Sequence, residues 1–350
     1  MVLSYYFIRP VYSFTWRVIK IFRRKKKNIL YCEDALDAEL FKNVRKHLGN
    51  LDLVAKNKNV LQKLRELGYK GTVMPSFPDS VIMFRNMAWK FPCKKIKKIG
   101  FKHGIYSFKR QSKAQYFNLF DVFFMTSDAD RKEAEKIGVK TAETIGCPKI
   151  DGAFDGSITR EQLKSLVNTI GLNPLKKTLL FSATWDGSGM SAIEKWYDRV
   201  GELKEKYNIL VTLHVWMSDK YVDVLKNTPG VYLIKEYEIL KYIMISDVCI
   251  GDTSSIIAEF CALDKPIVTF TVKDAPRVVN EVKELINKIS VQINSFDELE
   301  AALSIVEQRN DHYYQARKEA TKTFLGSPDG YAGLRAAQRI IELVPELAIK

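Results

Sequence analysis

Residues 245–270 read ISDVCIGDTSSIIAEFCALDKPIVTF, and this stretch indicates the fold class of the whole chain. One apolar run ends at Gly251-Asp252, small hydroxyl residues follow, and a second apolar run begins at Pro266. The pattern predicts a buried strand at 247–251, a helix at 254–263 and a second buried strand at 266–270. Strands that are apolar on both faces and are joined by a helix are typical of a parallel sheet covered on both sides.

The same alternation of short apolar runs and helical stretches extends over most of the chain. We expect further strands at 28–32, 51–55, 71–75, 98–101, 121–126, 178–184, 208–214 and 231–234. We expect helices between them, including 35–48, one near 79–90, 190–206 and 218–227, and closing helices at 296–307, 311–323 and 331–343. The sequence therefore predicts an α/β protein in which helices cover both faces of parallel sheets.

A break in this alternation suggests the domain organisation. Residues 155–177 contain polar residues, glycines and Pro174, and the alternation restarts after them. We therefore predict three parts: an N-terminal segment and two doubly wound Rossmann-like domains. The last helix of the second domain can pack back on the first domain. The ranges of the segment and the two domains are 1–27, 28–155 and 156–350. With two such domains facing a cleft, ligands are expected at the carboxyl ends of the strands.

The composition is that of a globular protein with an excess of positive charge. Apolar residues make up 46% of the chain and charged residues 27%, which argues against a disordered chain. Lysine and arginine number 55 against 41 acidic residues, a net charge of +14, so the surface should attract nucleic acid, an acidic membrane or phosphorylated substrates. Five scattered cysteines without a CxxC pair favour a reducing compartment and no zinc site.

The first 27 residues combine aromatic and basic side chains. Residues 1–22 hold seven aromatic residues, and the run RRKKK follows at 23–27. The aromatic residues are interrupted at Arg9, Pro10, Arg17 and Lys20. These interruptions argue against a transmembrane helix, and a secretory signal has its positive charges before the apolar region. An amphipathic helix in the plane of an anionic membrane fits better; the alternative is a core helix followed by a solvated basic tail.

The turn after residue 251 is a candidate anion site. Hydroxyl residues at 253–255 open the predicted helix, where they can cap it and where free N–H groups can bind phosphate. Glu259 lies one turn further along and could accept hydrogen bonds from a ribose. We interpret Asp252 as a brace for the loop rather than a metal ligand. The alternative is that a hydroxyl only caps the helix and that Glu259 is a solvated charge.

Six segments, in order along the chain, carry a resemblance to a known family. They are KHGIYSFKR (102–110), IGCPKID (145–151), SATW (182–185), TLHVW (212–216), ISDVCIGDTSSI (245–256) and PDGYAGLR (328–335). Together they resemble the CDP-glycerol glycerophosphotransferases, which build or prime teichoic acid polymers, over about residues 98–336. Four features depart from the family pattern. Lys109 lies one position late, and Asp186 replaces a basic residue after Trp185. His214 lacks a neighbouring arginine and proline, and Thr253 stands where the family often has tyrosine.

The resemblance implies a GT-B fold and a reaction in which an acceptor hydroxyl attacks the glycerol-bearing phosphorus of CDP-glycerol, with CMP leaving. The alcohol needs a base at neutral pH, and His103 is the candidate. His214, at the end of a predicted strand, could donate to the diphosphate. The resemblance assigns donor binding to Gly104, Lys109, Thr184, Trp185, Asp252, Thr253, Ser254, Ser255 and Glu259, and further cleft contacts to Pro148, Lys149, Asp151 and Arg335. We expect no metal and no cofactor.

The resemblance predicts an enzyme that transfers glycerol phosphate to a hydroxyl of a membrane-associated glycan or lipid-linked acceptor. Its expected partners are a nucleotide-activated donor, that acceptor and an anionic membrane surface, without nucleic acid. We expect it in the cytoplasm, peripheral on the inner face of the cell membrane. The alternatives on the same fold are a nucleotide-sugar glycosyltransferase, a sugar-nucleotide epimerase and a CDP-ribitol transferase. A binding protein for nucleic acid or membrane is a further alternative, which the charge of +14 supports.

Overall fold

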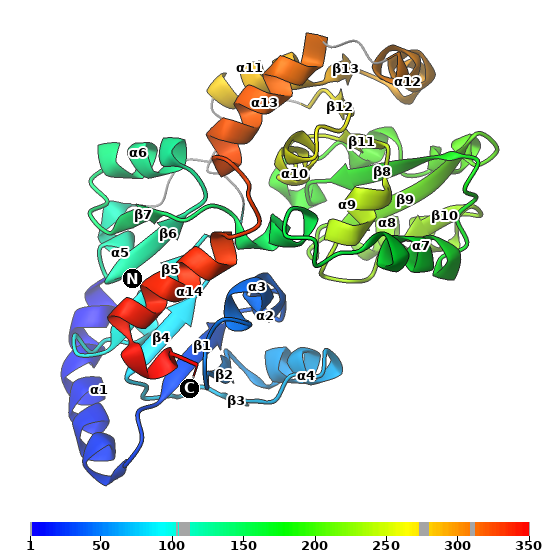
Figure 1. Ribbon diagram of the computed structural model, residues 1–350. Coiled ribbons are helices and arrows are strands. Elements are labelled where there is room, and N and C mark those ends of the chain that lie inside the picture. Colours follow the sequence, from blue (N-terminus) through cyan, green and yellow to red (C-terminus); the bar gives the residue numbers. More distant parts are fainter. Residues whose placement is uncertain (1, 103, 105–112, 273–279, 309–311, 350) are drawn as a thin grey trace. The chain divides into compact units, whose positions relative to one another are not determined.

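The computed structural model describes residues 2–102, 104, 113–272, 280–308 and 312–349 (Figure 1). These residues form two compact units. Described residues up to 151 and those from 328 onward make unit 1, and residues 152–327 make unit 2. The predicted division at 155/156 thus differs by a short stretch, and the end of the chain belongs to unit 1 because its last helix packs there.

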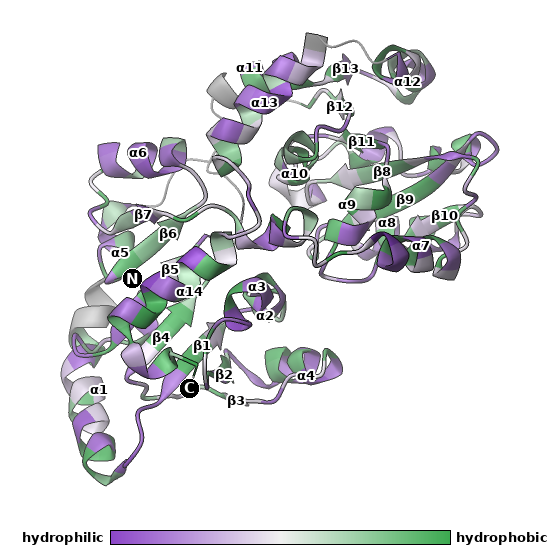
Figure 2. Cartoon of the chain, in the orientation of Figure 1, coloured by the Kyte–Doolittle hydropathy of each residue, from purple (hydrophilic) through white to green (hydrophobic). Residues whose placement is uncertain are grey.

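Unit 1 is built on a sheet of seven parallel strands in the order β3-β2-β1-β4-β5-β6-β7. The strands are β1 (Asn28–Cys32), β2 (Asp52–Ala55), β3 (Gly71–Val73), β4 (Ser80–Met83), β5 (Lys97–Phe101), β6 (Val122–Met125) and β7 (Ala142–Thr144). Every residue of β1, β4 and β6 is buried. In Figure 2 the strands of both sheets carry mainly the hydrophobic colour, as the apolar runs predict.

The helices of unit 1 are α1 (Val2–Phe22), α2 (Leu36–Leu40), α3 (Lys42–Arg45), α4 (Lys58–Glu66), α5 (Ala114–Phe117), α6 (Asp128–Lys136) and α14 (Ala332–Leu343). Helices α2 to α6 lie between consecutive strands of the sheet, whereas α1 precedes the first strand and α14 follows unit 2 in the chain. The last of these, α14, packs against α3. A Cβ at Gly333 would lie 2.5 Å from the carbonyl oxygen of Asn43 in α3. The close approach of α14 to α3 therefore requires glycine at this position.

One predicted helix of unit 1 is wrong. The sequence pattern predicts a helix near 79–90, but Ser80–Met83 is strand β4, and a single 3₁₀ turn follows at Ala88–Lys90. β4 pairs with β1 on one side and with β5 on the other. A short apolar run has no periodicity that distinguishes a buried strand from a buried helix. Here the run forms a strand because its backbone hydrogen-bonds to β1 and β5 on its two sides.

Unit 2 has a sheet of six parallel strands in the order β10-β9-β8-β11-β12-β13. The strands are β8 (Lys177–Ala183), β9 (Tyr207–Leu213), β10 (Val231–Leu233), β11 (Val248–Gly251), β12 (Ile267–Phe270) and β13 (Val291–Ile293). The helices are α7 (Arg160–Thr169), α8 (Asp219–Asn227), α9 (Leu240–Ile245), α10 (Ile256–Ala262), α11 (Asn280–Ile289), α12 (Leu299–Glu307) and α13 (His312–Leu325). The strand–helix–strand unit predicted at 247–270 is confirmed as β11, α10 and β12.

The connection between β8 and β9 differs from the prediction. In place of one helix at 190–206, the structure has two short 3₁₀ turns, at Ile193–Lys195 and Val200–Leu203. Trp196 lies between them and is fully buried in the core of unit 2. The irregular backbone lets this large side chain enter the core, where aromatic burial stabilises the unit more than regular helix geometry would.

The N-terminal helix α1 is part of unit 1. The indole N–H of Trp16 donates to the carbonyl oxygen of Pro78 at 2.6 Å, and Trp16 is 4% exposed. Lys20 and Arg23 both form ion pairs with Asp79. The opposite face exposes the apolar side chains of Phe7, Val11, Phe14, Val18, Ile21 and Phe22. One face therefore packs as the core-helix alternative expects, and the other presents apolar surface; no helix of the described residues is long and apolar enough to cross a membrane.

Candidate functional site

Asp252 is the centre of the turn that follows β11. Its carboxylate accepts hydrogen bonds from the amides of Thr184 and Ala192, at 3.0 Å each, and from the amides of Thr253 and Ser254. The hydroxyl of Thr184 donates to it as well, at 2.8 Å. Burial raises the pKa of Asp252, and the hydrogen bonds from these donors oppose that rise. Asp252 therefore holds the ends of β8 and β11 and the 3₁₀ segment in one arrangement, which makes it a brace.

Four hydroxyl groups gather beside this brace. The Ser182 hydroxyl donates to that of Ser254 at 3.3 Å, and the hydroxyls of Thr184 and Thr253 also lie 3.3 Å apart. α10 begins at Ile256, and Ser255, the capping residue, makes no side-chain hydrogen bond to the helix. The capping position is therefore Ser255, and not Thr253 or Ser254 as the alternative expects. A group of hydroxyls with rotatable protons can donate several hydrogen bonds to a phosphate.

Glu259 is buried in α10 and only 1% exposed. The alternative of a solvated charge at this position is wrong. Ile256, Ile257, Ala258 and Phe260 surround it along the helix, and all of them are buried. A role of Glu259 toward a ribose stays a prediction.

His214 and two tryptophans lie at the carboxyl ends of the neighbouring strands β8 and β9. The rings of Trp185 and Trp216 meet edge to face with centroids 5.6 Å apart, and the His214 ring lies 5.3 Å from that of Trp216. The amide of Trp216 donates to Nδ1 of His214 at 3.2 Å. A neutral His214 therefore carries its proton on Nε2 and can donate it outward. Trp216, which the sequence does not single out as a contact, is 59% exposed.

Asp186, which departs from the family pattern, has a structural partner. Its carboxylate accepts hydrogen bonds from the amide and the hydroxyl of Ser218, the residue before α8. The hydrogen bond from the Ser218 hydroxyl lowers the pKa of Asp186. The residue therefore links the segment after β8 to the start of α8, which holds the loops carrying Trp185 and His214 together.

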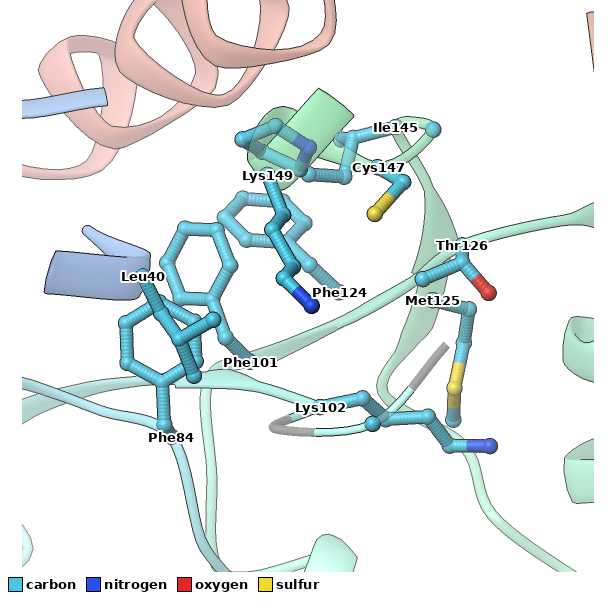
Figure 3. A pocket seen from close by; sticks show the side chains of 13 residues that line it. Leu40, Phe84, Phe101, Lys102, Phe124, Met125, Thr126, Ile145, Cys147 and Lys149 are labelled. Carbon is cyan, nitrogen blue, oxygen red and sulfur yellow. The ribbon is translucent and has the colours of Figure 1, made fainter. Parts of the chain in front are cut away.

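Unit 1 has a pocket at the carboxyl ends of β5, β6 and β7 (Figure 3). Its floor is aromatic: the rings of Phe84 and Phe101 stack with centroids 5.0 Å apart, and Phe124 meets Phe101 at 4.9 Å. Figure 3 shows the Lys149 side chain projecting into the middle of the pocket. Leu40, Gly104 and Pro148 also line it. An apolar floor under a cation suits a ligand with an anionic group on an apolar or sugar body.

A buried ion pair stands at the edge of this pocket. Lys102, which follows β5, donates to both carboxylate oxygens of Asp130 on α6. Burial lowers the pKa of Lys102 and raises that of Asp130, while the ion pair opposes both shifts. Lys102 and Gly104 flank His103 in the sequence, and both line the pocket. His103 itself and Lys109 lie outside the described residues.

Two of the predicted cleft contacts make hydrogen bonds that attach α14 within unit 1, and their contact with a ligand stays a prediction. Asp151 is 3% exposed and accepts hydrogen bonds from the amides of Ala332 and Gly333, so it caps the start of α14. Arg335 donates to the carbonyl oxygen of Ile145 and pairs with Asp329. Neither side chain lines the pocket. These residues attach α14 behind the segment that carries Pro148 and Lys149, a contact between distant parts of the chain that local sequence does not reveal.

Within the described ranges no group of three or more His, Cys, Asp or Glu side chains is placed to hold a metal ion. The groups that the structure does bring together in unit 2 are hydroxyls, a histidine and tryptophans, and those in unit 1 are aromatic rings and lysines. Such groups donate hydrogen bonds to anions and stack against rings.

Residues 96–346 match the model of the family described as CDP-Glycerol:Poly(glycerophosphate) glycerophosphotransferase. The chain belongs to this family. The resemblance predicted from the six segments is thereby confirmed. The match to the glycerophosphotransferase model begins one residue before β5. It includes the lining of the unit 1 pocket except Leu40 and Phe84, the residues of unit 2, and α14.

Two curated relatives of this glycerophosphotransferase family member act on teichoic acids. The teichoic acid glycerol-phosphate primase of Bacillus subtilis is 28% identical over 130 residues, 36% of this chain and 32% of the relative. The teichoic acid poly(ribitol-phosphate) polymerase of Bacillus spizizenii is 23% identical over 241 residues, 64% of this chain and 38% of the relative. The chain therefore spans about a third of the length of these curated relatives.

Solved structures establish the fold. The wall teichoic acid polymerase TagF matches with a TM-score of 0.71 at 15% identity, over 97% of this chain and 93% of that one. The S. aureus MnaA structure with UDP matches with a TM-score of 0.60 at 15% identity, over 92% of this chain and 98% of that one. With two parallel sheets in the described residues, the fold is GT-B-like, as predicted.

Proposed function

We propose that the protein transfers glycerol phosphate from CDP-glycerol to a hydroxyl of a membrane-associated glycan or lipid-linked acceptor and releases CMP. The observation that carries the proposal is the match of the glycerophosphotransferase family model to residues 96–346. One solved structure of the polymerase TagF is of a variant soaked with CDPG, which supports a CDP-linked donor here. The chemistry of the described side chains supports an anionic donor in unit 2.

The diphosphate of CDP-glycerol requires groups that donate hydrogen bonds to its oxygens, because negative charge develops there during the transfer. In unit 2 these are the hydroxyls beside Asp252 and Nε2 of His214. Trp185 and Trp216 offer ring faces beside them. As the acceptor oxygen bonds to the glycerol-bearing phosphorus, the bond from that phosphorus to the bridging oxygen breaks, and CMP leaves with the electron pair. Donors fixed in advance stabilise the charge on the leaving phosphate.

Unit 1 supplies the acceptor side in this proposal. His103 takes the proton of the attacking hydroxyl, since an unperturbed histidine has a pKa of about 6.5 and suits a base at neutral pH. Lys149 projects into the aromatic pocket, which Lys102 and Gly104, the sequence neighbours of His103, also line. The Lys102–Asp130 ion pair fixes the backbone beside His103. The aromatic floor provides a surface on which a sugar or lipid part of the acceptor can stack.

The donor is the first part of the proposal to test. Incubation of the purified chain with CDP-glycerol and a lipid-linked glycan acceptor should release CMP. CDP-glycerol alone should raise the unfolding midpoint, because a ligand at a hundred times its Kd adds about 2.7 kcal/mol to the stability of the folded state. UDP- and GDP-sugars serve as matched controls. CMP release from CDP-ribitol alone would move the donor to ribitol, which the ribitol-phosphate polymerase relative favours; stabilisation by UDP-sugars alone would contradict the transferase proposal.

Association with an anionic membrane is the second part of the proposed function. The exposed face of α1 presents Phe14, which is 68% exposed, and Ile21, which is 78% exposed, and the basic run 23–27 follows directly. Apolar residues can enter the acyl boundary while the cations meet anionic headgroups, each cation contributing about 1 kcal/mol. The enzyme would then work beside its lipid-linked acceptor on the cytoplasmic leaflet.

The double variant F14E/I21E should bind vesicles of phosphatidylcholine with phosphatidylglycerol about 100-fold more weakly than the wild type, because burial of each large apolar side chain contributes about 1.5–3 kcal/mol. Vesicle flotation measures this. The control L175E/I305E places the same charges on exposed apolar positions in unit 2 and should bind as the wild type does. Equal losses in both double variants would show that α1 is not the membrane contact.

A further inference from the structure

A second hollow of unit 1 lies at the opposite end of its sheet from the aromatic pocket. It is lined by the starts of β2 and β3, with Asp52 and Gly71, whereas the aromatic pocket follows the ends of the strands. The hollow has a volume of about 590 Å³ and opens to solvent. Three cations line it, Lys27, Arg45 and Lys70, against one carboxylate, Asp52. The lining therefore carries a net positive charge of about two.

Arg45 is the unusual member of this lining. One guanidinium nitrogen, Nη2, donates to the carbonyl oxygen of Leu51 at 3.3 Å. The other, Nη1, is buried and has no hydrogen-bond acceptor within the described part of the chain. A buried charged donor without an acceptor destabilises a fold, and nearly all such groups in proteins have a partner, whether protein, water or ion. The geometry of a guanidinium suits an anion with several oxygens, such as phosphate.

The two lysines strengthen the positive field at the same place. Lys27 ends the basic run at 23–27, and Lys70 directly precedes β3. No ion pair joins either lysine to a carboxylate among the residues that the structure describes. Within the same run, by contrast, Arg23 pairs with Asp79 and Lys26 with Glu346. In the described part of the chain, Lys27 and Lys70 thus form no ion pair, although the carboxylate of Asp52 also lines the hollow.

We propose that this hollow is a second phosphate site, in which Arg45, Lys27 and Lys70 bind a phosphate monoester or diester group at the starts of the unit 1 strands. A phosphate group brings a negative charge of one to two, which matches the net charge of the lining, and several acceptor oxygens for its cationic side chains. The group can come from a phospholipid headgroup or from a soluble polyol phosphate. The inference does not depend on the transfer reaction.

Inorganic phosphate is the first probe. The unfolding midpoint of the full chain, measured in sodium phosphate against sodium chloride of equal ionic strength, should rise in phosphate. The variant K27Q/K70Q should bind phosphate about tenfold more weakly in a titration without nucleotide. The matched control K164Q/K226Q removes two exposed lysines of unit 2 and should bind like the wild type. No stabilisation of the wild type, or equal losses in both variants, would overturn the proposal.

Arg45→Met separates binding from a structural role. If Arg45 binds the anion, the unfolding midpoint of R45M in chloride should equal or exceed that of the wild type. In phosphate it should lie below that of the wild type. If Arg45 only supports the fold, R45M should lose the same number of degrees in both salts, which contradicts the proposal.

Two further arms identify the source of the phosphate group. Weaker flotation of K27Q/K70Q than of K164Q/K226Q on vesicles with phosphatidylglycerol, but not on phosphatidylcholine alone, supports a lipid headgroup. Equal flotation of the two variants, together with weaker binding of glycerol 3-phosphate by K27Q/K70Q, supports a soluble polyol phosphate. Equal behaviour of the two variants in both arms rejects the site.

Discussion

Replacement of His103 by asparagine should lower the rate of CMP release from CDP-glycerol about 100- to 10,000-fold, because a positioned general base contributes about that factor. The change keeps the size and polarity of the side chain but removes the group that accepts the acceptor's proton. With wild-type protein the rate should fall about tenfold per pH unit below pH ~6.5, where an ordinary histidine becomes protonated. The residual activity of H103N should lack this limb of the pH profile.

The control for this experiment is His47→Asn. His47 follows α3 and lies outside the aromatic pocket. H47N should keep the wild-type rate and pH profile. Donor binding, measured as the rise of the unfolding midpoint with CDP-glycerol, should persist in H103N, because unit 2 carries the proposed donor contacts. A variant H103N that turns over at the wild-type rate would remove His103 from the mechanism.

Replacement of Asp252 by asparagine should destabilise the turn after β11 by about 2–4 kcal/mol. One carboxylate oxygen becomes an amide nitrogen that faces buried N–H groups, and each buried donor left unsatisfied costs about 1–3 kcal/mol. The amides of Thr184 and Ala192 donate to this carboxylate, so their hydrogen exchange should accelerate about 30-fold or more. The gain in midpoint with CDP-glycerol should disappear, because the hydroxyls beside Asp252 lose their fixed arrangement.

Asp247→Asn is a matched control on the same strand. Asp247 precedes β11 at its other end, is exposed, and accepts one hydrogen bond from the Thr178 amide. An exposed site re-satisfies its partner with water, so D247N should cost less than about 1 kcal/mol and should keep donor binding. If D252N shows wild-type exchange at residues 184 and 192, the carboxylate is not the brace that the hydrogen bonds indicate.

The sequence pattern predicts strands and helices correctly where apolar runs and helical stretches alternate clearly. β11, α10 and β12 fall within two residues of the predicted ranges because the apolar runs are bounded by Gly251-Asp252 and by the residues before Pro266. The pattern fails where an apolar run is short. Residues 80–83 form a strand because β1 and β5 pair on its two sides, and pairing partners distant in sequence leave no local signal.

Part of the candidate site follows from the same local reasoning. Asp252, Thr184 and the hydroxyls at 253–254 are expected together at strand ends, since parallel strands present their carboxyl ends on one edge. Trp216 is missed as a contact, because an exposed tryptophan two residues after a histidine has no motif of its own. Asp151 and Arg335 are predicted in a cleft, but their partners are on or behind α14, and only the packing of that helix shows this.

Local sequence is sufficient for the α/β class, the parallel sheets, the family and the residue types that serve anion chemistry, because periodicity, strand-end polarity and ordered motifs are local properties. Packing specifies the rest: which strand occupies the centre of the unit 1 sheet, which face of α1 is buried, that the Glu259 side chain is buried, and that Arg45, Lys27 and Lys70 line one basic hollow. Each of these depends on contacts between residues far apart in the chain, whose energies arise only when distant segments pack together.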